Sequence, residues 1–131
     1  MKGSAVRIVL MVAAVASVAL LPIVAASRNG DPLPREVRIV AKDMAFYVDG
    51  DPTPNPTLRF KAGEQIRLVL RNDDLGMTHD FVIKEWTVAT GTLTDKGTED
   101  SIVFRVPKQR ASTAYRCSPH SEMMRGSVHI D

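Results

Sequence analysis

The stretch Cys117-Ser118-Pro119-His120-Ser121-Glu122-Met123-Met124-Arg125-Gly126 lies between two short candidate strands, at 114–116 and 127–130. It contains the only cysteine of the 131-residue chain, a histidine three positions later and two methionines just beyond. Pro119 fixes its own φ angle and restricts the residue before it to an extended conformation, so the loop is stiff. A thiol, an imidazole and a thioether gathered in one stiff loop between two candidate strands predict a metal site there.

The donor types in this loop favour copper. Thiolate and thioether groups are soft ligands that suit Cu(I), and two histidines and one cysteine with a weak axial methionine form a blue-copper site. Cys117 and His120 supply two of these groups, and we expect His79, where a polar loop gives way to an apolar strand, to be the second histidine. His129 alternates with apolar residues in the last candidate strand, so it is predicted to face water.

The N-terminal 26 residues have a different character from the rest of the chain. Lys2 and Arg7 precede the run 8–26, which is apolar or small and contains no acidic residue. The length of the run 8–26 lies between that of a signal-peptide core and that of a membrane span. Small residues before Ala26 favour cleavage there, and retention as a membrane anchor is the alternative. We expect a signal peptide or anchor at 1–26 and a periplasmic or otherwise extracytoplasmic protein.

Charge and length limit the remaining possibilities. The chain has 17 basic and 15 acidic residues, and removal of Lys2 and Arg7 with the N-terminal segment leaves 15 of each sign. This balance gives no argument for nucleic-acid binding. A chain of 131 residues predicts one domain. We expect a linker at 27–35 and a domain at 36–131, acting as a monomer.

Beyond residue 35, apolar and polar residues alternate with the period of β-strands. The clearest candidates are 37–42, 58–61 and 66–71, with shorter ones at 81–83 and 102–106 besides the two that flank the loop. Turn-forming residues separate them, and 90–100 is either a short helix or a disordered turn. The pattern predicts an all-β antiparallel sandwich or barrel. Its aromatic core is expected to contain Phe46, Tyr47, Phe60, Phe81, Trp86, Phe104 and Tyr115.

These features resemble the cupredoxins, the type 1 blue copper proteins, over about 37–130. Cys117-Ser118-Pro119-His120 is similar to the Cys-x-Pro-His of plastocyanins and amicyanin. His120-Ser121-x-x-Met124-Arg125-Gly126 is similar to the end of the azurin loop. Phe60-Lys61-Ala62-Gly63-Glu64 and Asn72 are similar to the strand and turn before the first histidine in many members. The resemblance implies a Greek-key β-sandwich.

The resemblance also implies one copper ion with His79, Cys117 and His120 as equatorial ligands. For the axial ligand, the spacing in amicyanin selects Met123, whereas the azurin spacing and the Met-x-Gly ending select Met124, which we predict. The binuclear copper centre of cytochrome oxidase subunit two needs two bridging cysteines, and this chain has one.

Two positions depart from the family pattern. Asp80 stands where many members have an asparagine that ties the two ligand loops together, and its carboxylate can accept hydrogen bonds, for example from Ser118. Thr78 stands where azurins bring a glycine carbonyl near the copper, so a five-coordinate site is not favoured.

With all four ligand positions filled by protein groups, no position is left for a substrate, which catalytic metal sites usually keep open. The hypothesis is a non-enzymatic exported protein that carries single electrons between redox protein partners by Cu(II)/Cu(I) cycling. The alternative is a periplasmic copper-binding protein for copper handling or resistance. A copper enzyme would need an axial position that is vacant or filled by an oxygen ligand, for which Glu122 is the nearby candidate.

Basic residues dominate the sequence around the loop. If they share the copper end of the domain, they favour an acidic partner surface and faster encounter; otherwise they are scattered charges on strand faces. The residues concerned are Arg105, Lys108, Arg110, Arg116 and Arg125.

Overall fold

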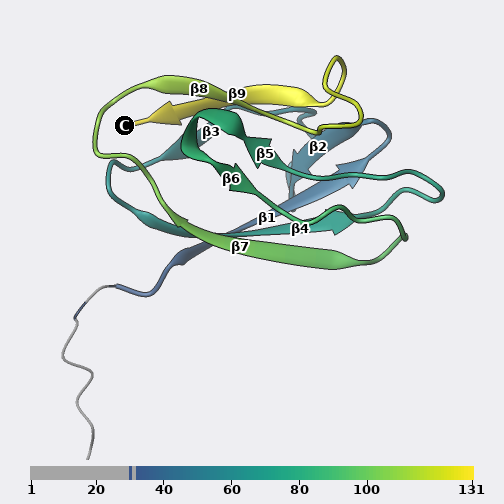
Figure 1. The fold of residues 1–131 in the computed structure, drawn as a ribbon, viewed down its shortest axis with the longest axis horizontal. Coiled ribbons are helices and arrows are strands. Elements are labelled where there is room, and N and C mark those ends of the chain that lie inside the picture. Colours follow the sequence, from purple (N-terminus) through teal and green to yellow (C-terminus); the bar gives the residue numbers. More distant parts are fainter. Residues whose placement is uncertain (1–29, 31) are drawn as a thin grey trace, which may run out of the picture. The chain divides into compact units, whose positions relative to one another are not determined.

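Two β-sheets pack face to face in the computed structural model, which describes residue 30 and residues 32–131 (Figure 1). The predicted signal or anchor at 1–26 therefore lies outside the described residues. One sheet has the strand order β2-β1-β4-β7, and the other has the order β3-β9-β8-β5-β6. The elements are β1 (Arg35–Lys42), β2 (Ala45–Val48), β3 (Leu58–Phe60), β4 (Gln65–Asn72), β5 (Val82–Ile83), the 3₁₀ helix η1 (Lys84–Trp86), β6 (Val88–Ala89), β7 (Glu99–Arg105), β8 (Ser112–Arg116) and β9 (Arg125–Ile130).

The all-β sandwich is confirmed, but the expectation of purely antiparallel sheets was wrong. β1 runs parallel to β4, and β3 runs parallel to β9. The cause is a change of sheet: after β2 the chain enters the second sheet as β3 and returns to the first as β4, beside β1. Within the described part of the chain, no helix has the length and hydropathy of a membrane span.

Period-two alternation predicted the buried faces of the long strands. In β1, Val37, Ile39 and Ala41 are buried, while the residues between them are exposed or half-buried. In β9, Val128 and Ile130 are buried and His129 lies half-exposed on the opposite face. His129 thus faces away from the core, as predicted.

The aromatic core is smaller than expected. Tyr47 is only half-buried, because Phe46 beside it in β2 takes the inward face and strand side chains alternate. Trp86 and Phe104 are partly buried and pack against the core at its margin. Four of the seven predicted residues have 1% or less of their surface exposed: Phe46, Phe60, Phe81 and Tyr115.

Three short elements carry too little pattern for prediction: β2, β6 and η1. The stretch 90–100 contains a turn, the isolated bridge between Leu93 and His79, and the first residues of β7, with no helix. This bridge consists of two hydrogen bonds, His79 N to Leu93 O at 3.0 Å and Leu93 N to His79 O at 2.8 Å. The stretch therefore holds the backbone of His79 in place.

Gly126 is the residue directly opposite Tyr115 in the β8–β9 ladder. The buried Tyr115 side chain crosses Gly126, stacks on Phe81 with ring centroids 5.1 Å apart, and donates a hydrogen bond to the carbonyl of Pro56 at 2.8 Å. A Cβ atom at position 126 would overlap the ring and hydroxyl of Tyr115. Glycine is needed here because an aromatic ring occupies the space of its side chain.

Gly126→Ala should lower the free energy of unfolding by about 3 kcal/mol, because the added methyl group overpacks a full core. Urea unfolding of the copper-free protein measures this change. The control is Ser127→Ala at the exposed next position, which should change stability by less than about 0.5 kcal/mol. Equal stability of the two variants would contradict the close contact.

Candidate metal centre

The pairing of β5 with β8 brings the two predicted ligand segments to one end of the domain. Val82 lies opposite Arg116 in this antiparallel pair. Continuing the same register beyond the strands places Asp80 opposite Ser118. The β4–β5 and β8–β9 connections both lie at the end of the sandwich away from the C-terminus (Figure 1).

Three predicted ligands meet at this end. The Nδ1 atoms of His79 and His120 each lie 3.7 Å from the Sγ atom of Cys117. One donor atom from each of the three residues lies within 4.8 Å of the other two. Glu122, the candidate oxygen ligand, is not part of this cluster.

The spacing of the donors fits one metal ion. Metal–sulfur and metal–nitrogen bonds in proteins are about 2.3 and 2.0 Å, values taken from zinc sites. Two such bonds at a tetrahedral to trigonal angle separate sulfur and nitrogen by about 3.5–3.7 Å by simple trigonometry. Both observed separations, 3.7 Å, agree with this range. The donor set of two imidazoles and one thiol matches the equatorial set of a type 1 copper site.

Burial isolates most of the cluster from water. His79 and Cys117 are fully buried, and His120 is half-buried. Burial raises the pKa of the Cys117 thiol, because a thiolate loses its hydration there. Metal binding must therefore release the thiol proton, and the metal affinity should depend on pH.

The β8–β9 loop is closed by its own backbone hydrogen bonds. The amide of Cys117 donates to the carbonyl of Met124 at 2.9 Å, and the amide of Met124 donates to the carbonyl of His120 at 2.9 Å. Asn55, in the β2–β3 connection, donates from Nδ2 to the carbonyl of Met123 at 3.0 Å. Met124 is fully buried, whereas 57% of the Met123 surface is exposed.

Asp80 ties the two ligand segments together. Its Oδ1 atom accepts a hydrogen bond from the backbone amide of Ser118 at 2.5 Å, across 38 positions of sequence. This contact confirms the expectation that a carboxylate can serve where many cupredoxins have asparagine. It follows from the β5–β8 register, which sets these two residues opposite each other.

Asp74 is a site residue that the sequence reasoning missed. Its Oδ2 atom lies 3.0 Å from Nε2 of His79, on the side of the ring away from Cys117. Burial disfavours the charged carboxylate, but hydrogen bonds from the amide of Asp43 and from His79 hold the pKa of Asp74 below its usual range. The available signal was an acidic residue five positions before the histidine. Neighbouring Asp73 carries nearly the same signal, so the sequence does not choose between them.

The basic residues around the loop divide into two groups. Arg116 and Arg125 lie opposite each other where the β8–β9 ladder meets the loop. Arg105 donates to the carbonyl of Gly63, and that glycine lies beside Lys108. Arg110 lies near the far end of the ladder, where Ser112 faces His129. Two of the five predicted cations therefore share the copper end.

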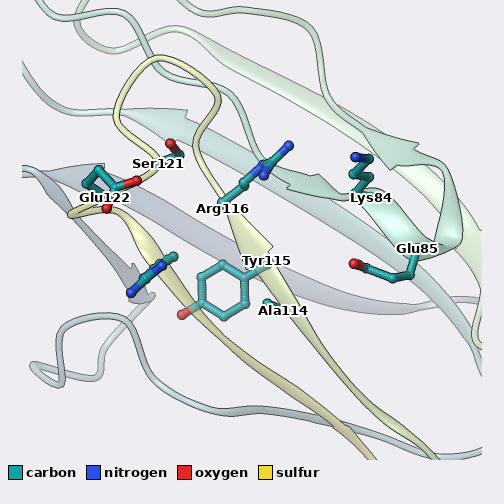
Figure 2. A pocket seen from close by; sticks show the side chains of 8 residues that line it. Lys84, Glu85, Ala114, Tyr115, Arg116, Ser121 and Glu122 are labelled. Carbon is teal, nitrogen blue, oxygen red and sulfur yellow. The ribbon is translucent and has the colours of Figure 1, made fainter.

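Arg116 and Arg125 line a hollow beside the β8–β9 loop (Figure 2). Lys84 adds a third cation, and Glu85 and Glu122 contribute carboxylates. The Oε2 atom of Glu85 accepts a hydrogen bond from Thr113 at 2.7 Å. The hollow thus has a small excess of positive side chains.

Comparison with known proteins shows the fold. No protein-family model and no curated protein sequence matches the chain. Auracyanin B matches with a TM-score of 0.60 and 20% identity, over 79% of this chain and 92% of its own. Rusticyanin from Thiobacillus ferrooxidans matches with a TM-score of 0.57 and 20% identity, over 73% of this chain and 76% of its own. The chain therefore has the cupredoxin fold, as the motifs predicted.

A larger enzyme contains the same fold. McoA, a multicopper oxidase from the hyperthermophile Aquifex aeolicus, matches with a TM-score of 0.61 and 14% identity. The match covers 74% of this chain but 26% of the oxidase. The fold by itself therefore does not separate electron carriers from enzymes.

Asp80→Ala should destabilise the copper-free protein by about 1–3 kcal/mol, because the amide of Ser118 loses a charged acceptor in a partly buried hydrogen bond. Asp80→Asn keeps an oxygen acceptor and should cost less. Urea unfolding of both variants measures the difference. If Asn and Ala are equally destabilising, the negative charge of Asp80 matters and the hydrogen bond to the loop does not.

Proposed function

We propose that this protein is a mononuclear type 1 copper protein that carries single electrons between redox partners. The observation that supports the proposal is the convergence of His79, Cys117 and His120 at the spacing of one metal's ligands. Copper bound there would supply one-electron chemistry by cycling between Cu(II) and Cu(I). The protein would hold nearly the same ligand positions in both states, because its loops are tied by hydrogen bonds that do not involve the metal.

Met124 is the axial ligand in this proposal. Its side chain is fully buried, and its backbone carbonyl accepts a hydrogen bond from the backbone amide of Cys117. Met123 is more than half exposed, and an exposed thioether is poorly placed for a buried site. Burial thus favours the azurin-like spacing over the amicyanin-like spacing.

Electron transfer is a better use of this site than catalysis on a bound substrate. Cys117, His79 and Met124 have no exposed surface, so substrate would reach a metal only after the loops moved. His120 is half-buried and is the ligand that reaches solvent. Its imidazole would be the route by which electrons enter and leave.

The setting and partners belong to the same proposal. The run 8–26 would direct the domain out of the cytoplasm, and N-terminal sequencing of the exported protein distinguishes cleavage after Ala26 from a retained anchor. Arg116 and Arg125 flank the loop that carries His120. They would favour a redox protein with acidic groups around its own electron-entry point, and would speed encounter at low salt.

Addition of Cu(II) to the purified domain should give an intense blue thiolate-to-copper band and reversible one-electron cycling. Cys117→Ala should abolish the band, since the thiolate is its source. His79→Ala should weaken or abolish it, and His129→Ala, a histidine outside the cluster, should leave it unchanged. Visible and electron paramagnetic resonance spectra make the measurement. A colourless complex that loses Cu(I) readily to a chelator would instead support copper handling.

Met124→Gln should shift the reduction potential far more than Met123→Gln, because the axial ligand tunes the potential of such sites. The two variants make the same chemical change at neighbouring positions, one buried and one exposed. Voltammetry of both copper proteins provides the comparison. A larger shift at position 123 would reassign the axial ligand.

A further inference from the structure

Asp74 contacts the buried histidine of the cluster on the side away from the thiol. His79 is fully buried, so water is not available to replace a partner at its Nε2 atom. The Oδ2 atom of Asp74 lies 3.0 Å from Nε2, within hydrogen-bond distance. A carboxylate oxygen only accepts hydrogen bonds, so this contact favours the form of His79 that carries its proton on Nε2.

The surrounding backbone holds this carboxylate in place. The other carboxylate oxygen of Asp74, Oδ1, accepts a hydrogen bond from the backbone amide of Asp43 at 2.9 Å. The backbone amide of Asp74 in turn donates a hydrogen bond to the side-chain oxygen of Asn72 at 2.9 Å. Asn72 is itself fully buried, and its Nδ2 group donates to the carbonyls of Met77 and Leu93. Asp74 thus has both carboxylate oxygens engaged before any metal is considered.

The β1–β2 turn that makes one of these contacts is a two-residue hairpin connection between the paired residues Lys42 and Ala45, and such a turn needs positive φ angles at both central positions. Asp43 and Met44 have φ angles of +51° and +59°, in the left-handed region. Aspartate tolerates this region, but methionine adopts it rarely. The turn directs the amide of Asp43 at Asp74. A turn kept in this conformation supports the Asp74 carboxylate.

We propose that Asp74 is a positioning residue that keeps Nδ1 of His79 free to bind the metal and lowers the reduction potential of the copper site. The second part rests on the proposed function. With Nε2–H donated to Asp74, the lone pair of Nδ1 faces Sγ of Cys117. A carboxylate partner also makes an imidazole a stronger donor, as in the carboxylate–histidine–metal groups of other proteins.

The sign of the effect on the potential follows from charge. Cu(II) carries one more positive charge than Cu(I), so a nearby negative charge in a poorly hydrated site stabilises the oxidised state more. Loss of such an outer partner typically weakens metal binding by about 10- to 100-fold. A tenfold loss of affinity for Cu(II), with the affinity for Cu(I) unchanged, raises a one-electron reduction potential by about 59 mV.

Asp74→Asn tests the proposal, with Asp73→Asn as the matched control. Asp73 is the neighbouring acid, and its carboxylate pairs loosely with Arg71 and Lys96, at 3.7 and 4.0 Å. Voltammetry should show a rise of about 59 mV or more for Asp74→Asn, the equivalent of a tenfold weaker preference for Cu(II), and a much smaller shift for Asp73→Asn. Equal shifts for the two variants would overturn the effect on the potential.

Nitrogen NMR of the histidine rings in the copper-free protein tests the positioning role without metal. Wild type should show His79 protonated at Nε2, and Asp74→Ala should shift the tautomer balance. A wild-type ring protonated at Nδ1 would overturn the proposal. If Asp74→Ala does not fold, Asp74→Glu replaces it in this measurement. Glutamate keeps the negative charge, so this variant should retain the wild-type tautomer. Failure of the wild-type protein to bind copper would overturn the proposed function. The NMR result would still show whether Asp74 sets the tautomer of His79.

Discussion

The antiparallel pairing of β5 with β8 is the constraint on which the whole site depends. Val82 opposite Arg116 sets Asp80 opposite Ser118, and this brings His79 to the loop of Cys117 from 38 positions away in sequence. A slip of one residue would turn each side chain of the moved strand to the other face of the sheet. The hydrogen bond from Ser118 to Asp80 is therefore both a result of the register and a lock on it.

The remaining hydrogen bonds make the ligand cluster rigid from several directions. Asn55 ties the β2–β3 connection to the β8–β9 loop, and Asn72 ties the end of β4 to the segments of Met77 and Leu93. Within the described residues, no buried side-chain nitrogen or oxygen lacks a hydrogen-bond partner. A polar network that is fully satisfied without metal favours one geometry over many. Such rigidity suits a metal whose charge changes while its ligands stay in place.

The sequence predicted the parts of this structure that depend on local pattern. Alternation in β1 and β9 identified the buried faces, and the composition of the loop identified Cys117 and His120 as neighbours of a second histidine. Non-local features escaped prediction. The parallel pairing of β1 with β4 depends on a crossing between sheets, and Tyr47 was assigned to the core because its residue type outweighed its position in a four-residue strand. Asp74 was missed because only the folded loop distinguishes it from Asp73.

Charges at the end that carries the ligand cluster divide by burial into two groups. Asp74 and Asp80 lie largely inside, where little water screens them, so in the proposed function their charges would act mainly on the relative stability of the oxidised and reduced states. Arg116 and Arg125 are exposed beside the loop, where salt screens them, so in the proposed function their charges would act mainly on the encounter with a partner. The two arginines lie directly opposite each other, a like-charge pair that costs stability. Because the two groups differ in burial, an electron carrier of this design could adjust its potential and its encounter rate independently: the inner acids would act on the first and the outer arginines on the second.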